Sequence, residues 1–118
     1  KNGRRPFKAI SLNTDTSFIT AWSNDFDYSS IFERQIEAFS SSLGLSIGLS
    51  TSGKSESVLN ALKLSNSLNI QTFLITGKNC PNYEFINHIV KLPSDETSII
   101  QTFTQVMYHL VCLKLEAH

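Results

Sequence analysis

The hydrophobic positions of this chain follow two periods in turn, one typical of strands and one typical of helices. Short apolar runs predict four strands, at residues 7–12, 43–50, 71–77 and 88–93. Apolar residues at helical spacing predict helices between and after them, at residues 17–24, 27–40, 52–69 and 94–118. Because strands alternate with helices, we expect an α/β fold with a doubly wound parallel sheet flanked by helices.

The pattern also predicts details of burial and capping. The run "LGLSIGLS" at residues 43–50 carries no charge, so we expect that strand to be buried on both faces. The helix at 17–24 is expected to lie on the sheet, and Cys112 to be a buried thiol in the last helix. Asp27 or Ser29 should cap the second helix and Ser94 or Asp95 the last one, since short polar side chains favour that position.

Composition narrows the class of protein. The 118 residues, 41% of them hydrophobic, suit one folded domain over residues 1–118. Ten basic residues balance ten acidic ones, so we expect no nucleic-acid partner, and Lys1, Arg4 and Arg5 form a local, solvated cluster. No apolar run is long enough to cross a membrane, so we expect no membrane partner either. No secretory signal opens the chain, and two cysteines make no disulfide framework, so we expect a cytoplasmic protein.

The stretch "GLSTSGKS", residues 48–55, raises a question of chemistry. Gly48, Gly53, Lys54 and Ser55 fit the P-loop pattern of nucleotide hydrolases. Such enzymes also need an acidic strand end for Mg²⁺, and neither "TFLITGK" nor "HIVKLP" supplies one, so we expect no nucleotide.

The same stretch fits a phosphate monoester better. Hydroxyl groups crowd between a buried strand and a helix start, where unpaired amides favour anions; they belong to Ser50, Thr51, Ser52 and Ser55. The alternative is a serine-rich turn that only caps the helix.

The last predicted helix carries a second group of candidates. Gln101 and His109 are eight residues apart, a little over two helical turns, so they lie roughly on one side, with Gln105 between them. They could face a ligand or form a solvent-exposed seam, and the spacing alone leaves both open. His88 is interpreted as a strand-entry residue and His118 as a frayed end.

Several stretches resemble one known family. They are "RRPFKAISLNTDTSFITAWSNDF", "GLSTSGKSESVLNAL", "FLITGKN" and "VKLPSDETSIIQTFTQVMYHLVCLKLE". From about Arg4 to its end the chain is similar to the sugar isomerase (SIS) domain family, and most closely to its isomerases of seven-carbon sugar phosphates. Family members often have Asn where Lys54 stands, and this lysine creates the match to a P-loop.

The resemblance implies a three-layer, flavodoxin-like sandwich and a homotetramer with active sites between subunits. It implies isomerisation of sedoheptulose 7-phosphate to D-glycero-D-manno-heptose 7-phosphate, which feeds lipopolysaccharide synthesis. Carried over by position, Ser50, Thr51, Ser52 and Ser55 would bind phosphate, and Asn24 and Asp25 would lie at the sugar. Gln101 and His109 would face the reacting carbons and, in some relatives, bind zinc with a His and a Glu from an earlier helix.

Two departures from the family pattern leave another function open. The family has an N-terminal helix, a strand, a Gly/Ser-rich loop and a catalytic glutamate before the position of Lys1, so the fold is expected to be N-terminally incomplete, with an exposed sheet edge. Some isomerases of the family have an acidic residue three positions before the glutamine, and this chain has Ser98 there. The alternatives are a non-catalytic module that binds the bacterial replication initiator, or a phosphosugar-binding regulator. The initiator-binding relative lacks a histidine at the position of His109, which favours the enzyme.

Overall fold

The computed structural model describes residues 6–117. The basic cluster of Lys1, Arg4 and Arg5, and His118, lie outside the described residues. The elements in chain order are the helix α1 (Thr16–Asp25), the short 3₁₀ turn η1 (Tyr28–Ser30), the helix α2 (Ile31–Phe39), the 3₁₀ turn η2 (Ser40–Ser42), the strand β1 (Leu45–Ser50), the helix α3 (Glu56–Ser67), the strands β2 (Gln71–Gly77) and β3 (His88–Leu92), and the helix α4 (Thr97–Glu116).

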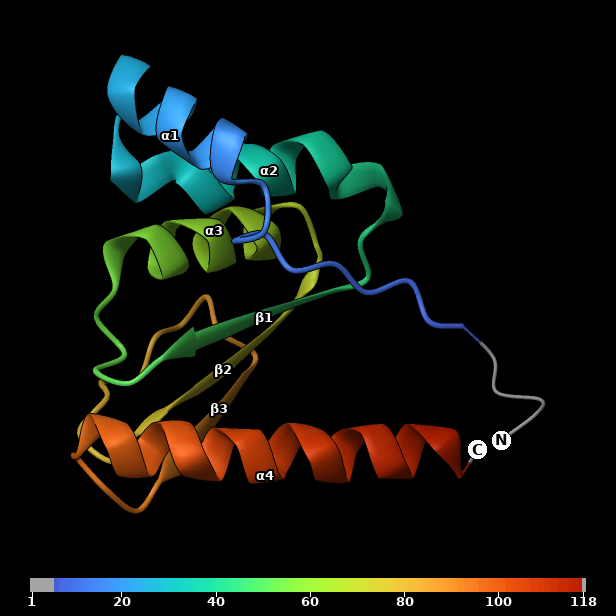
Figure 1. Cartoon of the computed structure of the whole chain (residues 1–118), viewed down its shortest axis with the longest axis vertical. Helices are drawn as coiled ribbons and strands as arrows, with labels where there is room; N and C mark the ends of the chain where they lie inside the picture. The colour runs from blue at the N-terminus through green and yellow to red at the C-terminus, as the bar shows by residue number, and fades with distance from the viewer. Residues whose placement is uncertain (1–5, 118) are drawn as a thin grey trace.

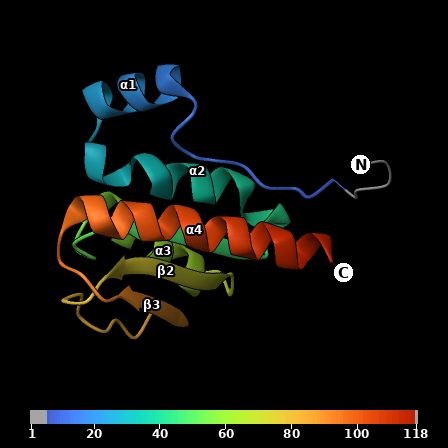
Figure 2. The same ribbon diagram turned by 60° about the horizontal axis from the view of Figure 1, so that its bottom comes forward.

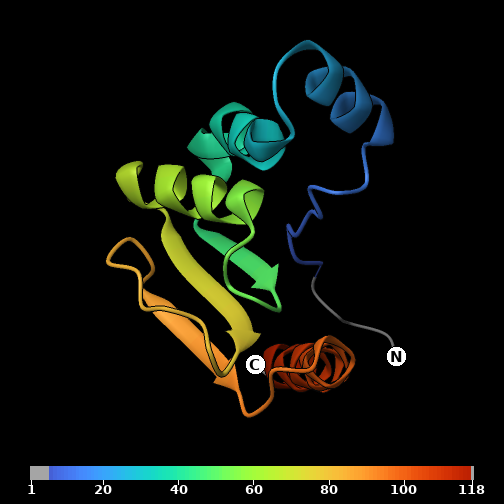
Figure 3. The same ribbon diagram turned by 90° about the vertical axis from the view of Figure 1, so that its left-hand side faces the viewer.

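The three strands form a parallel sheet in the order β1-β2-β3. Gly48 pairs with Leu74, and Ile75 pairs with Val90, so all three strands end at the same edge of the sheet. Helix α3 covers one face, with α2 packed against it, and α4 crosses the other face, so the sheet lies between two helical layers (Figures 1 and 2). Figure 3, which looks nearly along α4, shows the sheet between these layers. The predicted α/β class with a parallel sheet flanked by helices is confirmed.

The α3 face of the sheet holds most of the core. Leu62 of α3 and Leu74 of β2 are 2% and 0% exposed, and Cys80 and Ile86 of the β2–β3 connection pack with them. Gly48 lies under this helix: a Cβ there would come within 2.7 Å of Val58 and 2.9 Å of Leu62. A glycine in β1 therefore lets α3 approach the sheet closely.

The α4 face of the sheet is covered only in part, and the prediction that residues 43–50 are buried on both faces is wrong. Leu45, Ile47 and Leu49 of β1 are 50%, 59% and 56% exposed, whereas Ser46 and Gly48 between them are buried against α3. The reason is placement: the cluster under α4 gathers Ile75 and Leu92 of β2 and β3. Side chains on the second face of β1 point past that cluster, at the sheet edge.

The predicted strand at residues 7–12 is not formed. This segment is extended and mostly exposed, and within residues 6–117 it has no partner strand. Leu12 packs beside α2, whose Gln35 side chain donates a hydrogen bond to the Leu12 carbonyl at 2.9 Å. Alternation of apolar residues describes a segment that could pair, but a strand also needs a neighbour with free backbone groups.

Helix α1 packs on η1 and α2 rather than on the sheet as predicted (Figure 1). It has no fully buried residue. Its aromatic side chains stack on one another, with Trp22 between Phe18 and Phe26, and the Trp22 indole N–H donates to Ser30 Oγ at 2.8 Å. The helix therefore forms a layer outside α2.

Other local predictions are confirmed in part. Asp27 caps η1 by accepting a hydrogen bond from the Ser29 amide at 2.6 Å. Helix α4 begins after Glu96, whose side chain makes no cap bond; Ser94 Oγ instead accepts from the Glu96 amide at 3.1 Å. Cys112 is exposed, not buried, because no described element covers the C-terminal half of α4, where residues 108–116 are all exposed. His88 opens β3 as predicted.

Candidate phosphate-binding site

The turn that follows β1, residues 50–55, lies at the edge where the parallel strands end (Figure 1). The sequence pattern placed Ser52–Ser55 in the following helix, but α3 begins only at Glu56. The amide of Gly53 donates to the Ser50 carbonyl at 3.1 Å, which closes a tight turn. In open parallel sheets, ligands bind beyond this edge of the strands.

Gly53 sets the shape of the turn. Its φ of 66° lies in the left-handed region, where side chains are strained. A Cβ on Gly53 would also come within 2.2 Å of Cys80 Sγ and 2.8 Å of Thr76 Oγ1. The turn therefore lies directly on the end of β2 and on the β2–β3 connection, where no other residue type fits.

The start of α3 leaves hydrogen-bond donors unused by the helix. Ser55 is its N-cap residue but makes no side-chain cap bond, so its hydroxyl is not committed to the first turn. The first amides of an α-helix have no intrahelical partner, and the helix dipole adds partial positive charge there. Glu56 is exposed and acidic, as is favourable near a helix N-terminus.

The four predicted hydroxyl groups surround this helix start. Ser50, Thr51 and Ser55 are half-buried and Ser52 is exposed, so all four are open to solvent to some extent. Ser52 Oγ accepts from the Lys54 amide at 3.1 Å, and Ser55 Oγ lies 3.4 Å from Ser57 Oγ. Four hydroxyls and a helix N-terminus together can bind the oxygens of a phosphate group.

The Lys54 side chain is exposed, and the acidic residue nearest the strand ends is already paired. Strand β2 ends at Gly77 and β3 at Leu92, so neither places a carboxylate at the turn. Asp95 follows β3, but its carboxylate lies 3.1 Å from Lys78 Nζ. The hydrogen bond and charge of Lys78 hold the pKa of Asp95 below its ordinary value. This arrangement fits a phosphate site better than a magnesium–nucleotide site.

Asn24 and Asp25 end α1, with the Asn24 amide donating to Asp25 Oδ1 at 3.0 Å. Both are exposed. The end of α1 and the start of α3 lie on the same side of the molecule, the left in Figure 1, but the other helices place α1 further from the sheet. Within one chain, these residues approach the side of the turn without lining it.

Gln101 and His109 lie on α4, and both are exposed. The N-terminal end of α4 is beside the turn: Ile100 packs against Gly77, whose amide donates to the Thr51 carbonyl at 3.0 Å. His109 lies about 12 Å further along the helix axis than Gln101. Its position is half a helical turn away from that of Ile100, which faces the sheet. A single chain therefore does not bring His109 to the turn.

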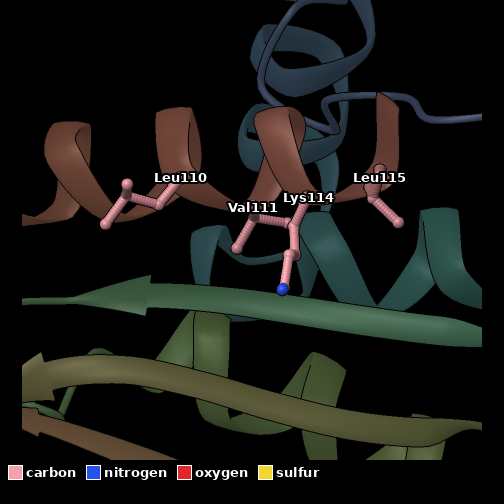
Figure 4. A pocket seen from close by; sticks show the side chains of 4 residues that line it. All are labelled: Leu110, Val111, Lys114 and Leu115. Atoms are coloured by element: carbon pink, nitrogen blue, oxygen red, sulfur yellow. The ribbon is translucent and has the colours of Figure 1, made fainter. Parts of the chain in front are cut away.

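Two surface hollows in the described part of the chain are lined by residues of α4. One of about 370 Å³ is lined by Ser98, Ile99, Thr102 and Phe103. Another, of about 380 Å³, lies between α4 and the open face of β1 and is lined by Leu110, Val111, Lys114 and Leu115 (Figure 4). Both are mainly apolar, so they suit packing against protein better than binding of a sugar phosphate.

The zinc ligands predicted on α4 do not form a site by themselves. Among residues 6–117, no group of three or more His, Cys, Asp or Glu side chains could hold a metal ion. Gln101 and His109 therefore need ligands from beyond these residues to complete a zinc site. Within residues 6–117, no helix combines the length and the hydrophobicity that a membrane span requires.

Comparison with known proteins identifies relatives. No family model matches the chain. Over 98% of its length it is 41% identical to the phosphoheptose isomerase of Aquifex aeolicus and 38% identical to that of Helicobacter pylori. The chain covers 61% and 60% of these proteins, and so spans about three fifths of their length.

Solved structures agree. The phosphoheptose isomerase of Francisella tularensis superposes with a TM-score of 0.88 at 27% identity, covering 98% of this chain and 62% of that one. The phosphoheptose isomerase of Neisseria gonorrhoeae superposes with a TM-score of 0.80 at 26% identity, covering 92% of this chain and 61% of that one. The fold is thus that of the sugar isomerase domain class. The chain is similar to phosphoheptose isomerases over the three fifths of their length that it spans.

Proposed function

We propose that the protein containing this chain isomerises sedoheptulose 7-phosphate to D-glycero-D-manno-heptose 7-phosphate. The observation that carries the proposal is the turn at Ser50–Ser55, where exposed hydroxyls meet the uncapped start of α3 in a homologue of phosphoheptose isomerases. The turn holds the phosphate, and Asn24 and Asp25 contact the sugar. The product would supply heptose for lipopolysaccharide synthesis.

The chemistry is a proton transfer between the first two carbons of the ketose, through an enediol. His109 is the acid/base residue, because an imidazole exchanges protons near neutral pH. Gln101 cannot exchange protons usefully and instead orients a substrate hydroxyl. A second acid/base group is needed on the other side of the substrate, and we assign it to the glutamate that the resemblance places before Lys1. If zinc is bound by Gln101 and His109 with further ligands, it would polarise the carbonyl oxygen, and His109 would then act partly as a ligand.

We further propose a cytoplasmic homotetramer with its active sites between subunits. Exposed apolar residues of α4 recur at intervals of four and three, a spacing typical of helices that pack together; they are Ile99, Phe103, Val106, Leu110 and Leu113. In one chain, His109 is directed away from the sheet and from the turn. Helix α4 of a neighbouring copy would therefore bring His109 to the phosphate turn. Two free cysteines in the described residues agree with a reducing compartment.

The test is turnover of sedoheptulose 7-phosphate by the full-length protein, with solvent-deuterium incorporation at the second carbon. His109→Asn should lower kcat by about 10²–10⁴-fold, because general acid/base catalysis is worth that much, while substrate binding survives. His88→Asn is the matched control, since His88 is an exposed histidine at the start of β3. Unchanged turnover in His109→Asn would remove His109 from the mechanism. Binding without turnover in the wild type would favour an initiator-binding module or a phosphosugar-binding regulator.

A further inference from the structure

The end of β2 and the β2–β3 connection fix the direction of two carbonyl groups in the phosphate turn. The Thr51 carbonyl accepts from the Gly77 amide at 3.0 Å, and the Gly53 carbonyl accepts from the Tyr83 hydroxyl at 2.9 Å. Both carbonyl oxygens therefore point into the protein. This matters because a carbonyl oxygen that faced a phosphate would repel its negative charge.

The opposite ends of the same peptide groups face outward. A trans peptide is planar, with its C=O and N–H in opposite directions, so inward carbonyls of Thr51 and Gly53 turn the amides of Ser52 and Lys54 outward. The Lys54 amide indeed donates to Ser52 Oγ, an exposed hydroxyl, at 3.1 Å. The turn thus presents donors on the side where an anion would bind.

The direction of the Gly53 carbonyl depends more than any other in the turn on a hydrogen bond from outside it. Glycine has more backbone freedom than any other residue, so the peptide after Gly53 could otherwise rotate. Of the side chains around it, Cys80 Sγ lies 3.9 Å from the Gly53 oxygen, at the limit for a weak thiol bond. Thr76 Oγ1 is buried and has no hydrogen-bond partner. The hydroxyl of Tyr83 is the strong donor to this carbonyl.

Tyr83 is itself held in position. Its ring packs against Phe85, with ring centroids 5.3 Å apart, and against the core of Leu62, Leu74 and Ile86. Thr72 anchors the end of the connection: its hydroxyl donates to the Phe85 carbonyl at 2.9 Å and accepts from the Asn87 amide at 2.9 Å. The donor that fixes the Gly53 carbonyl is therefore already in place before a ligand binds.

We propose that Tyr83 is a positioning residue for phosphate binding, which holds the Gly53 carbonyl inward and so keeps this acceptor away from the anion. The proposal deepens the proposed function and rests on it for the identity of the sugar phosphate. Tyr83 does not touch the substrate. It acts through the peptide between Gly53 and Lys54.

The test compares three substitutions in the full-length protein. Tyr83→Phe removes the hydroxyl and keeps the ring, and it should raise the Kd for inorganic phosphate and for sedoheptulose 7-phosphate about 3- to 10-fold. KM should rise with Kd, while kcat stays within about twofold, because the loss is in binding. Calorimetric titration gives Kd, and steady-state kinetics separate KM from kcat.

Two threonines of β2 are matched controls, since one lies against the turn and the other holds the β2–β3 connection. Thr76→Val deletes a hydroxyl that lies against Gly53 but makes no hydrogen bond, so both Kd values should stay unchanged. Thr72→Val breaks hydrogen bonds that hold the β2–β3 connection without touching the turn. It should lower the melting temperature without changing Kd.

Either of two results overturns the positioning role: an unchanged Kd in Tyr83→Phe, or an equal rise of Kd in Thr72→Val, which would mean general loosening of the connection. Failure of the isomerase proposal would look different. A wild-type protein that binds phosphate but shows no turnover, and whose Tyr83→Phe variant binds phosphate more weakly, would refute the isomerase activity and support the role of Tyr83. A wild-type protein that does not bind phosphate would overturn both.

Discussion

The phosphate turn and helix α4 carry the two halves of the candidate site, and their surroundings differ. The turn is fixed by Gly77 and Tyr83, and Gly53 packs tightly on Cys80. Helix α4 buries fully only Ile100, and it leaves Leu113 63% and Leu110 60% exposed. The turn is therefore preformed within one chain, whereas in our proposal α4 acts only beside a neighbouring copy.

The largest effect is expected from a charge on the exposed apolar side of α4. Val106→Glu should break the tetramer, because burying an unpaired carboxylate in an interface costs several kcal/mol (roughly 3–5 kcal/mol per broken pair is typical). Light scattering should report a lower mass, and circular dichroism a folded subunit. Ser67→Glu adds the same charge at an exposed position of α3 and should leave the mass unchanged. A tetramer that survives Val106→Glu, or a wild-type monomer at micromolar concentration, would contradict the proposed interface.

The next effect tests how firmly the turn is fixed. Gly53→Ala should lower the free energy of unfolding by about 2–4 kcal/mol, because it adds left-handed strain and a clash with Cys80. Denaturant unfolding measures the change. Gly44→Ala is the control: a Cβ there meets nothing within 4 Å, and stability should stay within about 0.5 kcal/mol. Equal stability of the two variants would mean that the turn is looser than described.

A smaller effect separates binding from capping at Ser55. Ser55→Ala should weaken sugar-phosphate binding about 10- to 100-fold, as expected for a lost hydrogen bond to a charged group. Replacing a capping serine usually costs about 1 kcal/mol of stability, but Ser55 makes no cap bond, so the stability should hardly change. Titration and thermal unfolding measure the two quantities. The exposed Ser67, changed to alanine, should alter neither. If Ser55→Ala lost stability but bound the sugar phosphate normally, Ser55 would be a helix cap and not a phosphate ligand.

The smallest effect concerns the ion pair beside the turn. Lys78 lowers the pKa of Asp95 from its ordinary value of 3.8, so the pair stabilises the folded state above that pH and loses this contribution as pH falls through the lowered pKa. Both groups are exposed, so the effect is small and screened by salt. Asp95→Asn should be slightly less stable than wild type at about pH 7, and this difference should shrink as the pH falls below the ordinary pKa of Asp95, 3.8. A difference that grows in acid would contradict this sign.

The difference between the turn and α4 also explains what the sequence could predict. Local patterns located β2 at Gln71–Gly77 and the hydroxyl-rich stretch after β1, because these depend on neighbouring residues, although they began α3 at Ser52 instead of Glu56. The segment at residues 7–12 also has a strand-like apolar pattern, but within residues 6–117 it has no partner strand, so the pattern alone predicted it wrongly. The exposure of Ile47 and Cys112 depends on which elements cover β1 and α4, and the local periodicity of the sequence does not show this.

The candidate site residues also divide into those that local sequence indicates and those that only the fold reveals. The hydroxyls of the turn could be predicted from their own spacing, but Tyr83 could not, because it lies 30 residues from Gly53 and reaches a backbone carbonyl. Backbone acceptors leave no mark in the sequence, so only the fold reveals this contact. A tyrosine after "GKNCPN" in a loop between two strands was the available signal, and it did not point to the turn.

The most direct test of the account is the dependence of binding on the phosphate group. The full-length protein should be titrated by calorimetry with sedoheptulose 7-phosphate and with sedoheptulose, in wild type and in Ser55→Ala. We expect binding of the phosphorylated sugar alone, competition by inorganic phosphate, and weaker binding in Ser55→Ala. Equal binding of the two sugars, or binding that is the same in wild type and Ser55→Ala, would contradict a phosphate site at this turn.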